Sequence, residues 1–309
     1  MNMRVLIATD GSAAGQRAVE LAGSITWPRG TQLRLVTVLE PLEPIMSAAW
    51  VLPGNQDGST NAEHESEKTA QAVLDQAARA LAHTGLDISR RIMHGRPASK
   101  IVENAKDFAV DLILMGSRGH GTVASMILGS VSAEVADRAP CPVLIARRSV
   151  LTRVILGVDG TDFGRRAEEV VATWPIFKNV AIEVTNVAQL ALPWTSGLAL
   201  SASEPPAAEI VETAEAIIAE HRKLCEEAAR RLAAAGRRVS ARVVQGYPAA
   251  ELIRAAEDHQ ADLVVVGTHG RAGSARVVLG SVARNVMLHA PCSVLLVREI
   301  QRNLSEAAA

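Results

Sequence analysis

Aromatic residues and cysteines are both scarce in this sequence. Phe, Trp and Tyr together make up 3% of the 309 residues, so a buried core has to be built from Val, Leu, Ile and Ala, as in many α/β proteins. The three cysteines, Cys141, Cys225 and Cys292, form no Cys-x-x-Cys or Cys/His ligand pattern. We therefore interpret them as small apolar core residues.

The sequence also lacks an excess of charge of either sign and lacks a long hydrophobic run. The formal net charge is −1 with Lys and Arg scattered, which gives no support for binding to nucleic acid or anionic membranes. The longest apolar stretches are cut by Arg147, Arg148 and Arg153, so none approaches the ~20 residues of a membrane span. The apolar part of the opening stretch, MNMRVLIATDGS, is too short for a signal peptide. We expect a cytoplasmic protein.

An internal repeat organises the chain. RVLIATDGS at 4–12 returns as RVILGVDGT at 153–161, GRPASKIVENA at 95–105 returns as GYPAAELIRAA at 246–256, and APCPVLI at 139–145 returns as APCSVLL at 290–296. The offset is 149 residues at the first match and 151 at the later ones. A two-copy repeat of this length predicts a tandem duplication with domains at 1–148 and 149–309.

Strand and helix patterns alternate within each copy. This alternation predicts parallel strands joined by right-handed crossovers, and hence an α/β fold with a doubly wound five-stranded sheet in each domain. In the first copy we expect strands at 4–9, 32–38, 87–93, in the apolar run that ends at Gly116, and at 143–146. We expect helices at 13–25 with Ser12 as its cap, at 63–83, at 97–108 and after Gly129, with a long loop at 40–61; copy two repeats this order, with a helix at 205–235.

The last strand of each copy is apolar and is expected at an edge of its sheet. An unpaired apolar edge is a liability. Pairing the two edges within the chain would remove that liability and make a pseudo-twofold dimer of domains. A homodimer of the whole chain is left open.

A glycine-rich stretch occurs in both copies, as DLILMGSRGHGTVASMILGSV at 111–131 and DLVVVGTHGRAGSARVVLGSV at 262–282. It reads as a buried strand, a glycine loop and the start of a helix, where free N–H groups and the helix dipole favour an anion. The predicted ligand group is a phosphate. The alternative is that the glycines only make turns and the serines only cap helices, and the repeated spacing favours phosphate. The residues are Gly116, Gly119, Gly129 and Ser130 in the first copy and Gly267, Gly270, Gly280 and Ser281 in the second.

The carboxyl ends of the first two strands are the other candidate positions, because ligands of such sheets bind where the strand order reverses. Asp10 and Asp159 each follow the first strand of their copy, and Val38 and Val187 end the second. A carboxylate beside a phosphate loop suits hydroxyl recognition or Mg2+ binding. The alternative role for each Asp is to cap the first helix, and its recurrence beside the second loop favours recognition.

These landmarks resemble the universal stress protein family over essentially the whole chain. Two features carry the resemblance. In each half, two glycines are separated by two residues, and a Gly-Ser pair follows after nine more. The first strand of each half is followed by Asp-Gly-Ser or Asp-Gly-Thr. The resemblance implies a five-stranded parallel sheet in the order 3-2-1-4-5 and the ATP-binding branch of the family, since another branch lacks these glycines. It also implies that the Asp binds the ribose, that the end of strand two binds adenine, and that the glycine loop and Ser bind phosphates. The implied binding residues are Asp10, Val38, Met115, Gly116, Arg118, Gly119, Gly129, Ser130 and Val131, then Asp159, Val187, Gly267, His269, Gly270, Gly280, Ser281 and Val282.

The loop side chains differ between the copies. Arg118 could neutralise phosphate charge, whereas His269 stands at the equivalent position with a less certain charge at neutral pH. Unequal affinity of the two sites is therefore a hypothesis, which nucleotide titration after separate disruption of Gly119 and Gly270 would test. We interpret His120 as a solvated loop residue.

The sequence favours a nucleotide-occupied stress-response module over a dedicated enzyme. GxxxxGK[ST] is absent, and neither a Ser/His/Asp set nor a pair of carboxylates stands out. Slow ATP hydrolysis or self-phosphorylation is the alternative function. An interaction scaffold that uses the loops at 40–61 and 189–205, with Trp50 and Trp194, is a third. AMP or ADP could replace ATP, and Mg2+ could accompany it.

Overall fold

The computed structural model describes residues 2–40, 57–119, 128–189, 207–268 and 279–300. The elements of the first half are β1 (Arg4–Ala8), α1 (Ala13–Ser24), β2 (Gln32–Leu39), α3 (Asp57–Leu81), the 3-10 helix η1 (Ala82–Thr84), β3 (Asp87–His94), α4 (Pro97–Asp107), β4 (Leu112–Gly116), α5 (Ser130–Arg138) and β5 (Val143–Ala146). Those of the second half are β6 (Arg153–Val158), α6 (Asp162–Thr173), the 3-10 helix η2 (Pro175–Phe177), β7 (Ala181–Ala188), α7 (Ala207–Ala234), β8 (Arg238–Gln245), α8 (Pro248–Asp258), β9 (Leu263–Gly267), α9 (Ser281–His289) and β10 (Ser293–Val297).

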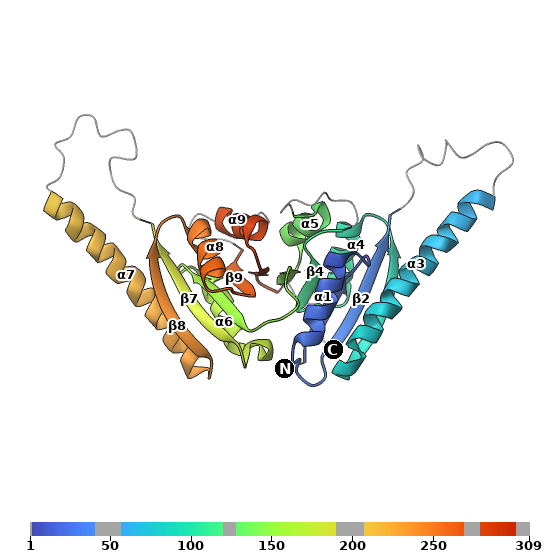
Figure 1. Cartoon of the computed structure of the whole chain (residues 1–309), viewed down its shortest axis with the longest axis horizontal. Helices are drawn as coiled ribbons and strands as arrows, with labels where there is room; N and C mark the ends of the chain where they lie inside the picture. Colours follow the sequence, from blue (N-terminus) through green and yellow to red (C-terminus); the bar gives the residue numbers. More distant parts are fainter. Residues whose placement is uncertain (1, 41–56, 120–127, 190–206, 269–278, 301–309) are drawn as a thin grey trace, which may run out of the picture.

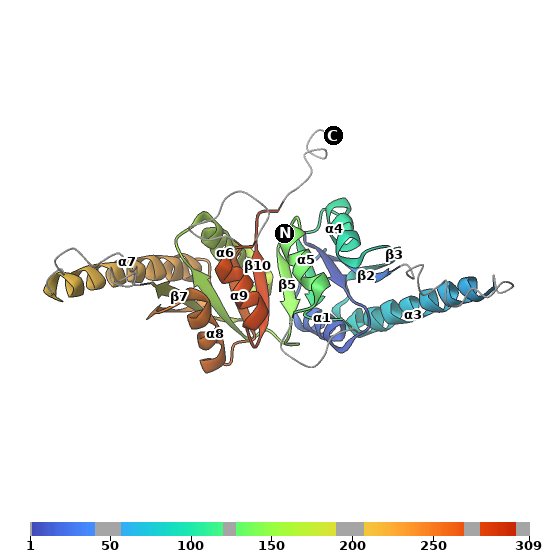
Figure 2. The same cartoon turned by 90° about the horizontal axis from the view of Figure 1, so that it is seen from above.

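One ten-stranded sheet runs through both halves in the order β3-β2-β1-β4-β5-β10-β9-β6-β7-β8. Each half therefore has the order 3-2-1-4-5 with parallel strands, as predicted. The halves meet where β5 pairs antiparallel with β10, with Leu144 opposite Leu295. Figure 2 shows these two strands side by side at the centre of the molecule. The predicted pairing of the two apolar edges within the chain is confirmed.

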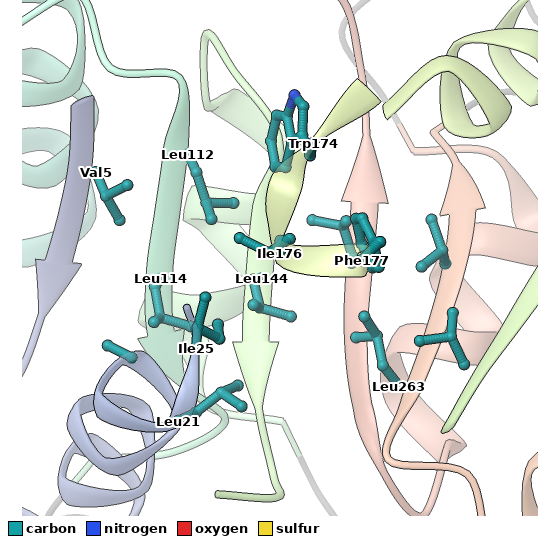
Figure 3. Packing of buried hydrophobic residues seen from close by; sticks show 14 of the residues in the cluster. Val5, Leu21, Ile25, Leu112, Leu114, Leu144, Trp174, Ile176, Phe177 and Leu263 are labelled. Atoms are coloured by element: carbon teal, nitrogen blue, oxygen red, sulfur yellow. The ribbon is translucent and has the colours of Figure 1, made fainter. Parts of the chain in front are cut away.

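Two hydrophobic clusters lie on the two faces of this sheet, because successive strand residues point to opposite faces. On β1, Val5 and Ile7 belong to the cluster under α1 and α3, whereas Leu6 belongs to the cluster under α4 and α5. Each cluster contains residues of both halves. Figure 3 shows Ile176 and Phe177 of η2 over the junction, close to Leu144 of the first half. The two halves thus share their core as well as their sheet.

The element boundaries follow the predictions closely, except at the start of α3. This helix begins at Asp57, six residues before the predicted start at position 63, so the predicted loop at 40–61 is wrong in its last part. The first turns of α3, DGSTNAE, carry no apolar period, and the outer part of the helix extends away from the sheet (Figure 1). Without an apolar period, the sequence gives no sign that a helix starts there. Trp50 and Trp194 lie outside the described residues.

The three cysteines are buried, as predicted for core residues. Burial raises the pKa of Cys141 to about 12 and that of Cys292 to about 11. Burial also raises the pKa of Cys225. The thiols therefore stay protonated and unreactive at neutral pH. Within the described part of the chain, no helix combines the length and apolar character needed to cross a membrane.

Candidate functional site

Asp10 lies where β1 gives way to α1, and its position is fixed by local hydrogen bonds. Gly11 makes the turn with φ of +82°, a conformation that favours glycine. The Ser12 backbone N–H then donates to Asp10 Oδ1 at 3.0 Å, and Ser12 Oγ accepts from Gly15 N–H at 3.2 Å as the cap of α1. Ser12 therefore caps α1, whereas Asp10 shapes the turn before the helix, and the bond from Ser12 N–H orients the Asp10 carboxylate.

The second half builds the same turn with Thr161 in place of Ser12. Asp159 Oδ1 accepts from the Thr161 backbone N–H at 3.0 Å and from Thr161 Oγ1 at 2.6 Å. Thr161 Oγ1 in turn accepts from Gly164 N–H at 3.2 Å at the start of α6. Asp159 is thus held as firmly as Asp10, and by the same chemistry.

Gly119 brings the glycine loop against the Asp10 carboxylate. A Cβ at Gly119 would lie 2.7 Å from Asp10 Oδ2, so a larger residue there would displace the carboxylate from this arrangement. The two residues are 109 positions apart in the sequence, and both are exposed at the carboxyl edge of the sheet. The structure therefore assembles two of the sequence-predicted site residues into one place. In the second half, His269 and Gly270 lie outside the described residues.

Gly116 and Gly267 have a packing role at the ends of β4 and β9. A Cβ at Gly116 would lie 2.4 Å from the carbonyl carbon of Ala14 in α1. A Cβ at Gly267 would lie 2.7 Å from the carbonyl carbon of Phe163 in α6. These contacts are with backbone, which cannot move aside, so glycine is required here for the helix to reach the strand whether or not a ligand binds.

The glycine loop is closed at its base by a backbone hydrogen bond. Gly129 N–H donates to the Ser117 carbonyl at 2.8 Å, and Gly280 N–H donates to the Thr268 carbonyl at 2.7 Å. Each of these glycines is the N-terminal cap residue of the following helix, α5 or α9. The strand end and the helix start are therefore joined directly, and the helix N-terminus faces the carboxyl edge of the sheet.

The predicted serines lie directly after these backbone hydrogen bonds, at the N-termini of α5 and α9. Ser130 and Ser281 are the first residues of α5 and α9, and both are exposed. Val131 and Val282 follow them half-buried. Sequence reasoning missed Ser132, which is 3% exposed and whose Oγ donates to the Gly116 carbonyl at 2.8 Å. Ser132 ties α5 to the end of β4, and its repeat equivalent is Ala283, so the sequence repeat gave no signal for it.

Val38 and Val187 lie at the ends of β2 and β7, as predicted. The last pair of β1 with β2 is Ala8 with Val36, so Asp10 and Val38 each lie two residues beyond that pair. The side chains of both valines are half-buried against the hydrophobic cluster under α4, α5, α8 and α9. Their backbone groups lie near the strand ends. Met115 is 4% exposed and packs in the same cluster, so its side chain supports the site from below.

The family model described as the universal stress protein family matches residues 1–147 and 151–298. The chain belongs to the universal stress protein family. Both halves of the chain are matched separately, so it is a tandem member of that family. Its two universal stress protein halves form a pseudo-dimer within one chain through β5 and β10.

Universal stress proteins of the same tandem length are similar to this one. One from Mycolicibacterium smegmatis is 28% identical over 305 residues, which covers 95% of this chain and 96% of the relative. One from Mycobacterium tuberculosis is 27% identical over 312 residues and covers 96% and 97% of the two chains. A shorter one from Thermus aquaticus is 33% identical over 144 residues, which covers 46% of this chain and 97% of the relative.

Solved structures of universal stress proteins are among those similar to this chain. One from Archaeoglobus fulgidus has a TM-score of 0.64 at 19% identity and covers 96% of this chain and 98% of its own. A crystal structure of a universal stress protein in complex with cAMP is 32% identical, covers 47% of this chain and 97% of its own, and has a TM-score of 0.35. The first of these supports the arrangement of all ten strands.

The second half of this universal stress protein carries buried polar side chains that the first half lacks. Glu168, 6% exposed, accepts from Arg231 Nη2 at 2.7 Å, and its equivalent in the first half is Val19. His221 Nδ1 lies 2.5 Å from Asn186 Oδ1, and Asn186 Nδ2 donates to the Val158 carbonyl at 2.8 Å. Sequence reasoning missed both pairs, although the departures from the repeat could have indicated them.

Replacing Arg231 with alanine is expected to lower the free energy of unfolding by about 2 kcal/mol at pH 7, because a buried carboxylate loses its cation. Burial is the main cause that raises the pKa of Glu168, and Arg231 lowers it. Without Arg231 the folded-state pKa rises further above the unfolded value. The folded variant therefore gains a proton as the pH falls through that raised pKa, and the loss of stability shrinks.

Urea unfolding of Arg231→Ala at pH 7 and pH 5 measures this effect. The matched control is Arg230→Ala, since Arg230 is the adjacent exposed arginine on α7 and donates to the Glu226 carbonyl. The control should unfold like the wild type at both pH values. An equal loss at pH 7 and pH 5 would contradict the assignment of the effect to the Glu168 carboxylate.

In the part of the chain that the structure describes, no group of three or more His, Cys, Asp or Glu side chains could hold a metal ion. Asp10 and Asp159 each follow the end of a strand, and each is oriented by a backbone N–H. A Mg2+ ion there would need oxygens from a ligand as well as from the protein. The residues thus fit a metal that arrives with phosphates better than a resident one.

Proposed function

We propose that this universal stress protein binds an adenine nucleotide at the carboxyl edge of each half, with ATP as the preferred nucleotide. The observation that carries the proposal is the convergence of Asp10, Gly119 and the exposed start of α5 at one edge of the sheet. This edge supplies an oriented carboxylate from Asp10, a stretch of backbone without a side chain at Gly119, and the N-terminus of α5. Those three groups suit a ribose hydroxyl, a close-approaching phosphate chain and a phosphate charge.

Each residue has a distinct role in this proposal. Asp10 accepts hydrogen bonds from ribose hydroxyls, while Ser12 N–H keeps the carboxylate oriented. The backbone at the end of β2, around Val38, pairs with the edge of the adenine. Gly119, Gly129 and Ser130 receive the phosphates, and the backbone N–H groups at the start of α5 donate to them.

The second half repeats these roles on the proposed domain 149–309, as the first half does on 1–148. Asp159 takes the ribose, the end of β7 at Val187 takes the adenine, and Gly280 and Ser281 take the phosphates. The backbone N–H bond to Asp159 matches that to Asp10, and the capping bond of Thr161 matches that of Ser12, which supports two sites. The output of the protein is then a change in its partners or shape when the sites are occupied, as befits a stress-response module.

Gly119→Val tests the first site with little risk to the fold. Gly119 is exposed, its φ is unstrained, and the added Cβ would meet only the end of the Asp10 side chain. Isothermal titration calorimetry of nucleotide-free protein with ATP, AMP and cAMP should give two equivalents for the wild type and one for Gly119→Val. The remaining equivalent should vanish when Asp159→Ala is added.

The second-half site serves as the internal control for that experiment. A variant that keeps two equivalents after Gly119→Val would remove the first site from the proposal. Circular dichroism of each variant confirms that the sheet is intact. Wild-type protein that binds none of the three nucleotides would contradict the proposal as a whole.

A further inference from the structure

A cavity of about 250 Å³ is lined by residues of both halves, near the junction where β5 and β10 pair. The first half contributes Arg17, Ser117, Arg118 and Arg147, and the second half contributes the segment from Leu288 to Pro291. At ~30 Å³ per water, this volume corresponds to about eight waters. The cavity therefore has room for a small ligand and exists only because the two halves are joined.

Three guanidinium groups line this cavity without a carboxylate. None of its described lining residues is acidic, and among the described residues no salt bridge reaches Arg17, Arg118 or Arg147. Arg147 is held in place by the carbonyls of Cys292 and Met287, at 3.3 Å and 2.5 Å. Burial is the main cause that lowers the pKa of Arg147, and the charge of Arg118 also lowers it. Arginine side chains stay charged in proteins, so the three arginines repel one another unless an anion lies between them.

The equivalent of Arg17 on the other side of the pseudo-twofold axis is paired with a carboxylate. Arg166, the repeat equivalent of Arg17, pairs with Glu299 at 2.8 Å, and Glu299 stands where the first half has Arg148. Asp137, an acidic residue that pairs with Arg284 at 3.0 Å, stands where the cavity has Leu288. The duplication therefore supplies its own comparison, because the second copy pairs this arginine with an acidic residue and the described part of the first copy does not.

We propose that the junction cavity binds a small phosphate-type oxyanion, of about the size of pyrophosphate, between Arg17, Arg118 and Arg147. Guanidinium groups recognise phosphate oxygens through paired hydrogen bonds, and three of them suit a ligand with more than one negative charge. The anion would lie between the two halves, since Leu288 and Pro291 of the second half line the same cavity as the arginines. The ligand is either free, or the phosphate end of a nucleotide held by the first half, which Arg118 adjoins.

The test is titration of nucleotide-free protein with inorganic pyrophosphate, followed by calorimetry. Arg17→Gln should weaken the affinity about tenfold or more, as expected for loss of one charge-assisted contact. Arg148→Glu copies the Glu299 arrangement onto Arg17 from an exposed position, so it should weaken binding as much while keeping the fold. Arg166→Gln is the matched control and should leave the affinity unchanged.

Gly119→Val separates this site from the nucleotide site. Pyrophosphate binding that survives Gly119→Val but falls with Arg17→Gln and Arg148→Glu supports a free-anion site in the cavity. If only ATP affinity falls with Arg17→Gln, the cavity takes the phosphate end of the nucleotide, and the proposal holds in that form. Equal effects of Arg17→Gln and Arg166→Gln would overturn the proposal. So would pyrophosphate binding that is lost in Gly119→Val and untouched by Arg17→Gln and Arg148→Glu, or wild-type protein that binds neither anion.

Discussion

Phe177→Ala is expected to lower the free energy of unfolding by about 3–5 kcal/mol, the range for a large aromatic side chain removed from a core. Phe177 is 0% exposed and lies in η2 over the junction of the two halves (Figure 3). Its cluster includes Leu144 of the first half and Leu263 of the second. The cavity left by the substitution would therefore weaken both halves together.

Chemical denaturation followed by circular dichroism and by tryptophan fluorescence measures this loss. The account expects one transition in the wild type that shifts as a whole in the variant, since sheet and core are continuous. Phe108→Ala is the control, because Phe108 is half-buried under the Arg34 guanidinium, 3.5 Å from the ring centroid, and should cost far less. Two separate transitions, of which Phe177→Ala moves only one, would contradict a shared core.

Gly116→Ala is expected to lower the free energy of unfolding by about 2–3 kcal/mol. We expect this loss to exceed that of an alanine at any other described glycine. The new Cβ would lie 2.4 Å from the Ala14 carbonyl carbon and 2.5 Å from its oxygen. Relief requires α1 to move away from β4, which would open the packing of both. Because Ser12 caps α1 and Asp10 precedes it, the movement would also disturb the candidate site.

Gly119→Ala, three residues along the same loop, is the matched control for Gly116→Ala. Its Cβ would meet only Asp10 Oδ2, the far end of a side chain, so its free energy of unfolding should stay close to that of the wild type. Thermal and urea unfolding of the two variants measure the contrast. Similar stabilities for both variants would contradict the close packing of α1 against β4.

Local chemistry explains which parts of the fold were predictable from the sequence. Ser12 has the side chain of a helix cap, and α1 begins directly after it. Strand β5 was predicted at its observed bounds, because an apolar run lies between Pro142 and Arg147. The pairing of β5 with β10 followed from the need to cover two apolar edges. The start of α3 was missed because its first turns have no apolar face to show.

The candidate site was predictable as a set of residues but not as a geometry. Repeated spacing indicated Asp10 and Gly119 separately, and only the fold shows that the glycine lies against the carboxylate. Contacts between residues far apart in the chain carry no local signal. Glu168 with Arg231, and the arginines of the junction cavity, are of this kind. Comparing the two copies position by position would have pointed to Glu168 and Arg231, whose equivalents are Val19 and Ala80, but not to Arg17 and Arg147, which recur in the second copy.

The measurement that tests the account most directly is the nucleotide content of the purified, heat-denatured protein, followed by ATP titration of the emptied protein. The account predicts adenine nucleotide bound up to two equivalents per chain, with one equivalent lost in Gly119→Val. A protein that is purified empty and then fails to bind ATP, AMP or cAMP would contradict it. The glycines would then be purely architectural, as Gly116 and Gly267 already are in part.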